Sequence, residues 1–446
     1  MELHSSKKLF FKGTHRIISP KETKERILKE IKRSKLPIYD EIIDISGYNK
    51  TKIPVYAITH SKRFGKCRIP DWKCTGGCCS NCRLPSWGKG LTDDAALVSG
   101  LMERVERYIA SDILSRESEI VFSDFNSLKN KGAMSRWDFI PCNLQRKLYS
   151  KKEVDKQVRP WVSCFSLTKN KDVFVPANLI FFSSEWCQDD FSDTTGLATG
   201  NTLEEAIVHA LCEIIERHIE DVVLWNKIKV PTIPINSIKD KDLIKLIKDI
   251  QINEGLEVRI SYLTGNFKIP AIRVFAYPRN PPYLLTMAFY SSVGVHPDKD
   301  IALSRALTEL MQSRASTLYR IDEKYSQLDS SSCFPSELLS FYTQTIGNDV
   351  VSFDKVDSYE NEDILEDIKL ITGILHNFGS EIIIKDLTCA QLNIATVRVL
   401  ATGLQPGIFG ISIPNPKHKA ARITSHLNCY DYLKKNIKNI ELLSGS

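Results

Sequence analysis

The chain has 446 residues, 42% of them hydrophobic, so it can bury more than one small core and we expect two or three packed subdomains. Lysine and arginine (60) nearly balance aspartate and glutamate (54), and a net charge of +6 indicates neither nucleic acid nor an anionic membrane as a partner. No apolar run approaches the roughly 20 residues of a membrane span and the first residues lack a signal-peptide core, so we expect a soluble, cytoplasmic protein.

The N-terminal segment, residues 1–65, contains one predicted helix and one predicted strand. Residues 20–35 (PKETKERILKEIKRSK) begin with a proline and alternate charged and apolar residues at helical spacing. Residues 53–60 (IPVYAITH) have the composition of a strand. These elements carry no recognisable chemistry of their own.

A cysteine-rich loop is predicted at residues 66–86, where glycine and proline interrupt the chain. A long chain without an export signal does not indicate a disulfide scaffold, although it contains 12 cysteines. The clustered cysteines are Cys67, Cys74, Cys78, Cys79 and Cys82. Thiolates so close in sequence suit zinc or an iron–sulfur cluster, but the spacing matches no common motif closely. Structural zinc is our first expectation, and an iron–sulfur cluster, a sulfur-carrying cysteine pair and unligated thiols remain alternatives.

The main indication of function is a sequence motif, here called the repeated phrase, that recurs at the start of three predicted helices. GLTDDAALVSGLMERVER (residues 90–107) aligns with GNTLEEAIVHALCEIIER (residues 200–217), and a degenerate copy occupies residues 296–314. The apolar residues of the first two copies follow a 3.6-residue period, which predicts helices at about 92–113 and 202–224.

A second duplication predicts the fold class. Residues 243–278 and residues 364–403 both read as helix, glycine-bearing turn, strand, short loop and strand. A helix–strand–strand module used twice indicates a pseudo-symmetric α+β fold with antiparallel pairing. We take residues 87–410 as the core of the protein and residues 411–446 as a C-terminal tail.

The repeated phrase places acidic side chains on one face of each helix, because positions i, i+4 and i+7 lie together. The residues concerned are Glu103, Glu106, Glu205, Glu213 and Glu216. A solvated helix face would explain one such copy, but three copies in register with apolar flanks predict converging, buried acids that need a cation. Oxygen ligands without a histidine–cysteine set suit Mg²⁺, which commonly keeps positions open for phosphate oxygens. Arg217 and Arg314, beside the acids, suit those phosphates.

The stretch WGKGLT (residues 87–92) does not form a P-loop. Arg83 stands where the motif requires its first glycine, and Gly90 replaces the serine or threonine after Lys89. A lysine between glycines at the start of a helix can still bind phosphate through its ammonium and the nearby N–H groups.

The three copies together resemble the motifs of the YcaO superfamily. The resemblance rests on GKGLTDDAALVSGLMERVER, TGLATGNTLEEAIVHALCEIIERHIED and VGVHPDKDIALSRALTELMQSR, in that order, and covers roughly residues 10–410. The opening GTHRIISPKET and the stretch ISGYNKTKIPVY resemble the subgroup encoded with TfuA-like partners, which includes enzymes that thioamidate a glycine of methyl-coenzyme M reductase.

The resemblance implies a YcaO-type fold with an internal ATP site built on helices, and an ATP- and Mg²⁺-dependent enzyme acting on peptide backbone amides. Carried over by motif, the residues that would contact nucleotide are Lys89, Ser99, Asn201, Arg217 and Arg314. The five glutamates above would hold Mg²⁺, and Glu309 and Gln312 would line the same pocket. Asn201 stands where some members have glutamine.

The implied chemistry transfers phosphate to the amide oxygen and then lets sulfur attack the activated carbon. External sulfide gives a thioamide, whereas a neighbouring cysteine, serine or threonine gives an azoline ring. Family members that form azolines commonly end in a proline-rich tail, and this chain ends in NCYDYLKKNIKNIELLSGS. We therefore expect thioamidation of a peptide or protein, as in the biosynthesis of ribosomal peptide products, with an azoline-forming cyclodehydratase as the alternative. The intact glutamates disfavour a third reading, a non-catalytic peptide-binding scaffold.

The partners that follow are a peptide or protein substrate, a TfuA-like protein and a source of sulfide. A homodimer remains open. The catalytic residues themselves are not assigned by the sequence.

Overall fold

A computed structural model describes residues 1–60, 85–112, 114–135, 138–139, 155–181, 194–263, 267–278, 289–324 and 342–404. The helices are α1 (Pro20–Ser34), α3 (Asp93–Ser111), α4 (Phe125–Lys129), α7 (Leu203–Trp225), α8 (Lys241–Asn253), α9 (Lys299–Lys324) and α11 (Ile364–Phe378). The strands up to the middle of the chain are β1 (Leu9–Phe11), β2 (Thr14–Arg16), β3 (Glu41–Asp44), β4 (Val55–Thr59), β5 (Ser86–Lys89), β6 (Ile120–Ser123), β7 (Arg159–Ser166), β8 (Lys171–Pro176) and β9 (Leu197–Gly200). The later strands are β10 (Val230–Ile233), β11 (Leu256–Tyr262), β12 (Ala271–Pro278), β13 (Tyr290–Val295), β14 (Ile346–Val350), β15 (Ile382–Asp386) and β16 (Ala395–Ala401).

The strands form two larger and two smaller sheets, which makes the fold α+β as predicted. One sheet has the order β6-β7-β15-β16-β9, with β8 on the other side of β7, and another has the order β13-β12-β11-β10-β14. The strands β3-β4-β5 form a third sheet and β1-β2 a hairpin. Among these described strands, the pair β10–β14 is parallel and the other pairs are antiparallel.

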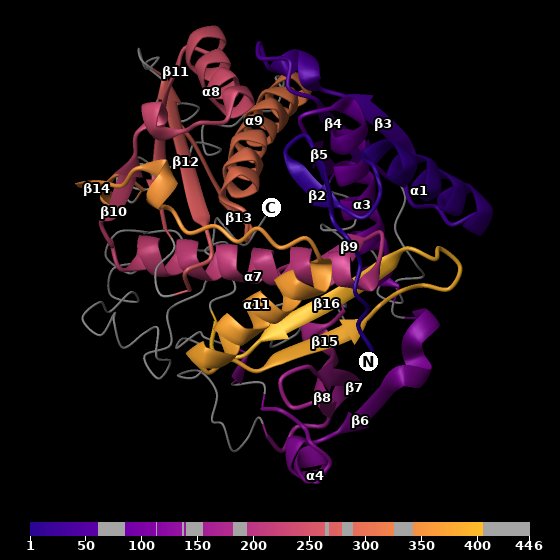
Figure 1. Cartoon of the computed structure of the whole chain (residues 1–446). Helices are drawn as coiled ribbons and strands as arrows, with labels where there is room; N and C mark the ends of the chain where they lie inside the picture. Colours follow the sequence, from indigo (N-terminus) through magenta and orange to yellow (C-terminus); the bar gives the residue numbers. More distant parts are fainter. Residues whose placement is uncertain are drawn as a thin grey trace.

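The predicted duplicated modules are present. In the first, α8 leads into the antiparallel pair β11–β12, and in the second, α11 leads into the antiparallel pair β15–β16. A glycine with positive φ follows each helix, Gly255 at +67° and Gly379 at +91°, because only glycine turns the chain out of a helix there without a Cβ penalty. The two modules lie on opposite sides of α7 (Figure 1).

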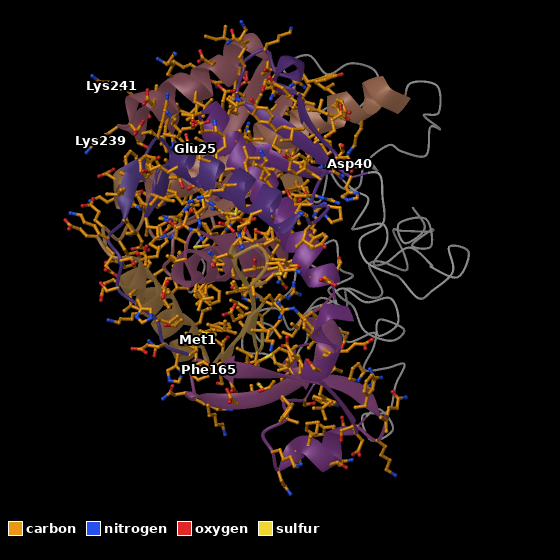
Figure 2. The ribbon with its side chains drawn as sticks, turned by 90° about the vertical axis from the view of Figure 1, so that its right-hand side faces the viewer. Met1, Glu25, Asp40, Phe165, Lys239 and Lys241 are labelled. Carbon is orange, nitrogen blue, oxygen red and sulfur yellow. The ribbon has the colours of Figure 1, made fainter. Side chains whose placement is uncertain are left out.

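Helix α7 runs across the middle of the molecule and organises its core (Figure 1). Its apolar residues are buried together with those of β13, α11, β15 and β16. A second core joins α1, α3, β7 and β8, and a third joins α8, α9, β11 and β12. In the view turned by 90°, Glu25 of α1 lies above Phe165 of β7, and the second core joins these two elements (Figure 2).

Three strand–turn–helix units, β5–α3, β9–α7 and β13–α9, carry the repeated phrase. Each helix begins at an N-cap side chain in register with the others: Thr92 accepts from Ala95 N, Thr202 from Glu205 N, and Asp298 from the N–H groups of residues 300 and 301. The predicted helices over 92–113 and 202–224 are confirmed within two residues at each end. The same spacing therefore delivers the same helix face three times.

The N-terminal predictions are also confirmed. Helix α1 begins with a capping box in which Ser19 and Glu22 satisfy each other's backbone N–H groups, and Pro20 occupies its first turn. Strand β4 lies within the predicted residues 53–60. The clustered cysteines, most of the predicted loop at 66–86 and the tail at 411–446 lie outside the described residues, so they stay predictions. In the described part of the chain, no helix is long and apolar enough to cross a membrane.

A side chain at Gly294 is expected to destabilise the fold, because β13 packs its backbone directly against α9. A Cβ built at Gly294 would lie 2.0 Å from the Ala302 carbonyl oxygen. We expect Gly294→Ala to lower the free energy of unfolding by about 1–3 kcal/mol, measured by urea denaturation. Gly373→Ala in α11 is the control, since its Cβ would meet nothing within 4 Å and we expect it to be neutral or slightly stabilising. Equal stability of the two variants would contradict the close strand–helix contact.

Candidate functional site

A polar cavity of about 350 Å³ lies where the three strand–turn–helix units meet. Its walls come from β5, α3, β9, α7 and α9, and the β1–β2 hairpin covers one side. The acids that line it are Glu103, Glu106, Glu205, Glu213, Glu216 and Glu309, and the cations are Lys12, Arg16, Lys89, Arg107, Arg217 and Arg305. The five glutamates predicted from the repeat thus share one cavity, together with Lys89, Ser99, Asn201 and Arg217.

The acids of α3 are held by the strands that precede the helices. Glu103 accepts a hydrogen bond from the Trp87 backbone N–H at 2.9 Å and pairs with Arg107. Glu106 accepts from both the N–H and the hydroxyl of Thr199 through its Oε1, at 2.9 and 3.0 Å. Burial and then the nearby Glu103 and Glu213 raise the pKa of Glu106 well above its usual range. Glu106 thus connects helix α3 to strand β9. Its ionised form is unfavourable in this buried, acidic surrounding unless a cation lies nearby.

Two acids of α7 are held in the same manner. Glu205 accepts from Ile17 N at 2.6 Å and, through its other oxygen, from Asn201 N at 2.8 Å and Asn201 Nδ2 at 2.9 Å. Glu213 accepts from Gly196 N at 3.0 Å, and its Oε1 lies 3.8 Å from Nη2 of Arg217. Glu205 thus also fastens the N-terminal segment to the cavity wall.

Glu216 and Glu309 form a coupled acidic pair between α7 and α9. Burial, and then the charge of Glu309, raise the pKa of Glu216 to about 8. Burial acts on Glu309 in the same direction, but its ion pair with Lys89 and the charge of Arg217 lower the pKa of Glu309. Glu216 is therefore the carboxyl of this pair that is easier to protonate, and Glu309 is the one that pairs with Lys89.

The register of the repeat identifies a cavity residue that the sequence analysis missed. Arg305 occupies on α9 the position that Ser99 occupies on α3 and His209 on α7, and all three line the cavity. Burial and then the charges of Arg305, Arg16 and Lys89 lower the pKa of His209 well below its usual range, so this imidazole is neutral. The shared position was the sequence signal for Arg305.

Arg314, in contrast, is not among the residues lining the cavity. Its Nε lies 3.0 Å from Oε2 of the buried Glu254, the last residue before the turn that ends α8, and its guanidinium lies 5.7 Å from the centre of the Tyr290 ring. The reason is geometric: Arg314 is nine residues after Arg305, about two and a half helical turns, so it projects from the opposite face of α9, toward α8. The predicted nucleotide contact of Arg314 is therefore not supported by this geometry.

The N-terminal hairpin contributes two more cations that the sequence analysis did not assign. Lys12 and Arg16 both line the cavity. The Ile17 bond to Glu205 holds the end of the hairpin, and the Lys8 ammonium forms a buried ion pair with Asp367 of α11 at 2.6 Å. Residues nearly 200 positions apart in sequence thus complete one site.

The donor set fits phosphate oxygens and a hard cation. Within the part of the chain that the structure describes, buried atoms without a hydrogen-bond partner include Asn201 Oδ1, Gln312 Oε1, Arg217 Nε and Arg305 Nε, all from residues that line the cavity. Unpaired oxygens and guanidinium N–H groups of this kind are costly unless a ligand satisfies them. Oxygen donors match Mg²⁺, and the arginines match phosphate.

No group of three or more histidine, cysteine, aspartate or glutamate side chains stands ready to hold a metal ion in the described ranges. Four of the cavity glutamates instead accept backbone N–H groups, namely Glu103, Glu106, Glu205 and Glu213. Glu309 pairs with Lys89. The predicted zinc or iron–sulfur ligands among the clustered cysteines fall outside the described residues.

Comparison with known proteins gives a family match over most of the chain. A family model described as YcaO cyclodehydratase, ATP- and Mg²⁺-binding, matches residues 87–405. An uncharacterized protein of Methanothermobacter thermautotrophicus is 29% identical over 352 residues, which cover 76% of this chain and 85% of that protein. An uncharacterized protein in the tfuA 3′ region of Rhizobium leguminosarum bv. trifolii is 29% identical over 241 residues, 52% of this chain and 55% of that protein.

Two solved structures share the fold. A heterocyclase in complex with substrate and cofactor has a TM-score of 0.72 at 20% identity, over 93% of this chain and 56% of its own. A YcaO protein from Methanopyrus kandleri bound with AMPPCP and Mg²⁺ has a TM-score of 0.63 at 23% identity, over 89% of this chain and 94% of its own. At these identities the likeness concerns the fold, and this chain spans only about half of the heterocyclase.

Proposed function

This chain belongs to the YcaO family, and on that premise we propose that it uses ATP and Mg²⁺ to activate a backbone amide of a peptide or protein for attack by sulfide, which yields a thioamide. The observation that carries the proposal is the meeting of acids from three registered helices with Lys89, Arg217 and Arg305 in one cavity. Fixed cations around a shared acidic cluster are the arrangement that phosphoryl transfer requires.

The residues have distinct parts in this proposal. Lys89, Arg217 and Arg305 bind phosphate oxygens, with Ser99 and Asn201 as uncharged hydrogen-bonding groups beside them. The acids that would hold Mg²⁺ are Glu103, Glu106, Glu205, Glu213 and Glu216. The metal would supply charge neutralisation and orientation of the phosphates. Lys89, which pairs with Glu309 in this structure, would bind phosphate oxygens.

The reaction proceeds in two steps. The amide oxygen attacks the γ-phosphorus, the bond from that phosphorus to the bridging oxygen breaks, and ADP leaves with the bonding electron pair. Sulfide then attacks the activated carbon, and the former amide oxygen leaves as part of inorganic phosphate. The net change is amide, ATP and hydrogen sulfide to thioamide, ADP and phosphate. The cavity residues position the phosphates and stabilise their charge, and no side chain becomes covalently attached.

One observation supports sulfide as the nucleophile over an adjacent side chain. One relative lies in a tfuA 3′ region, which is the gene context of the proposed TfuA-like partner. The azoline-forming cyclodehydratase is the second candidate, because one structure with the same fold is a heterocyclase.

The mass of the product tests the proposal. Purified protein, ATP, Mg²⁺, sulfide, a TfuA-like protein and a candidate peptide are incubated and the peptide is weighed by mass spectrometry. Thioamidation raises the peptide mass by about 16 Da, whereas ring closure lowers it by about 18 Da. A loss of water would establish the alternative, and no ATP-dependent phosphate release with any peptide would overturn both.

Arg305 and Arg314 are expected to have separable effects on binding and stability. Arg305→Met removes a guanidinium from the cavity, so we expect ATP affinity to fall about 10–100-fold with little change in unfolding. Arg314→Met leaves the buried Glu254 carboxylate without its cationic partner and with the hydrogen bond from Thr51 N. We therefore expect a loss of about 3 kcal/mol in stability and ATP affinity within threefold of the parent. Isothermal titration calorimetry and urea denaturation measure the two quantities. Weaker ATP binding by the Arg314 variant alone would restore Arg314 as the phosphate ligand.

A further inference from the structure

Asn201 has one polar atom that the protein leaves unused. This residue directly follows β9, lines the cavity and is 6% exposed. Its backbone N–H and its Nδ2 both donate to Oε2 of Glu205, at 2.8 and 2.9 Å, and its carbonyl oxygen accepts from Nη1 of Arg26 at 2.8 Å. Within the described residues, its Oδ1 is buried and has no hydrogen-bond partner. This carboxamide oxygen is therefore the group of Asn201 that remains for a ligand in the cavity.

The chemistry of the Asn201 oxygen limits what it can bind. An amide oxygen accepts hydrogen bonds and binds hard cations, so it does not pair with a bare phosphate oxygen, which is also an acceptor. In the proposed reaction its partner is a donor of the nucleoside, either the base amine or a sugar hydroxyl, or the Mg²⁺ ion. A buried acceptor without any partner is costly, so a ligand that satisfies this oxygen gains affinity as long as the oxygen is held in place.

Arg26 of α1 holds the main chain at Asn201. Helix α1 buries Ile27 in the second core, which fixes the turn of the helix that carries Arg26. The Nη1 group of Arg26 donates to the Asn201 carbonyl, and its Nη2 group donates to the Asn393 carbonyl at 3.1 Å. Asn393 lies between β15 and β16 and has a positive φ of 49°. One guanidinium thus joins α1 to two turns that are far apart in the sequence.

This double contact suits an arginine that does not itself bind the ligand. The planar guanidinium presents its N–H donors in a fixed fork, so it can bind two carbonyl groups at once, whereas lysine is a flexible point charge. Hydrogen bonds from a charged donor are also stronger than neutral ones. Arg26 is not among the described residues that line the cavity, so it contacts Asn201 rather than the space that the ligand would fill.

We propose that Arg26 is a positioning residue that fixes the backbone of Asn201, and with it the unpaired carboxamide oxygen, for contact with the nucleotide or its Mg²⁺. The inference rests on the proposed function, because it takes the cavity as the ATP site. Glu205 orients the Asn201 carboxamide through Nδ2, and Arg26 holds the carbonyl of the same residue. Both contacts must be present for the oxygen to keep one position.

Arg33 provides a matched comparison on the same helix. It lies two turns beyond Arg26 and donates to the Gln391 carbonyl at 3.0 Å, so it binds the same turn between β15 and β16. In the described part of the chain its other hydrogen bond goes to Glu30 rather than to Asn201. Removing Arg33 therefore weakens the attachment of α1 without touching the cavity wall.

A double-mutant cycle tests the proposal with the full chain and AMPPCP plus Mg²⁺ as the ligand. We expect Arg26→Met to weaken binding by calorimetry about 10-fold in the parent protein and less than twofold in the Asn201→Ala background. Arg33→Met should bind within twofold of the parent. The Arg26 change should also raise the KM for ATP more than it lowers kcat, because it acts on nucleotide binding.

Inorganic triphosphate plus Mg²⁺ identifies the partner of the Asn201 oxygen, because this ligand has neither base nor sugar. If the oxygen binds the cation, Arg26→Met should weaken the binding of triphosphate as much as that of AMPPCP. If the oxygen accepts from the nucleoside, the loss with triphosphate should be less than twofold. Either result, together with the loss for AMPPCP, supports the role of Arg26.

Failure of the inference can be told apart from failure of the proposed function. If the parent protein does not bind AMPPCP, the proposed function fails and the inference fails with it. If the parent binds but Arg26→Met binds equally well, or loses as much affinity in the Asn201→Ala background, Arg26 does not act through Asn201. A tenfold loss in the Arg33 variant would assign the effect to the attachment of α1 and would also overturn the inference.

Arg26→Lys provides a second reading should the methionine variant not fold. Lysine keeps the positive charge but cannot bind both carbonyl groups in the manner of the guanidinium. Weaker AMPPCP binding in the parent that is absent from the Asn201→Ala background supports the inference. Unchanged binding, or equal weakening in both backgrounds, overturns it.

Discussion

Glu213→Gln is expected to lower ATP-dependent amide modification by about 10³-fold while leaving the fold intact. The glutamine carbonyl can still accept the hydrogen bond that Gly196 N gives to Oε2 of Glu213, so the contact between α7 and the turn before β9 survives. The charge is lost at the place where α7 faces α3, in a cavity whose acids must hold a cation against phosphate. A neutral amide binds Mg²⁺ far more weakly than a carboxylate does.

The measurement is phosphate release and peptide modification under saturating ATP, Mg²⁺ and sulfide. Circular dichroism and urea denaturation establish that the Glu213 variant is folded. Glu41→Gln on the exposed end of β3 is the matched control and should retain full activity. Activity within tenfold of the parent would remove Glu213 from the metal-binding set and weaken the case for carboxylates of the repeat as Mg²⁺ ligands.

The repeat was readable from sequence because its signals are local. An N-cap side chain, a helical period and fixed spacing to the glutamates lie within a single segment, and each is set by the geometry of one helix. The same local logic predicted the two helix–strand–strand modules, whose glycine turns Gly255 and Gly379 mark the helix ends. The residues that share each helix face and the α+β fold class could therefore be predicted from the sequence alone.

The parts of the site that the sequence did not predict mostly depend on contacts between segments far apart in the chain. Arg314 stands beside the repeated acids in sequence, but its side chain is drawn to Glu254, 60 residues earlier, and nothing in the local pattern reveals that partner. Lys12 and Arg16 reach the cavity because Ile17 binds Glu205, 188 residues later. Arg305 was accessible in principle, since register with Ser99 and His209 singles it out once the third copy is aligned by its alanine and Glu309.

Glu216→Gln is expected to stabilise the ligand-free protein at alkaline pH, although it should abolish the proposed activity. Burial and the charge of Glu309 raise the pKa of Glu216 to about 8 in the folded protein, against 4.5 for the ordinary carboxyl. Folding therefore takes up a proton at intermediate pH. The stability linked to this proton is fully present below about pH 4.5 and is lost as the pH rises through about 8.

Glutamine at position 216 does not titrate and carries no charge into the buried pair with Glu309. The stability difference between variant and parent should therefore grow by about 2–4 kcal/mol from pH 5 to pH 9, measured by urea denaturation without nucleotide. Glu366→Gln on the exposed face of α11 should follow the parent curve throughout. Saturating ATP and Mg²⁺ should reverse the order, because ligand binding stabilises the parent through its intact acids and the variant much less. If the stability of the variant and that of the parent changed with pH in parallel, Glu216 would be ionised in the folded protein at neutral pH. The cavity would then accommodate its charged acids without a cation.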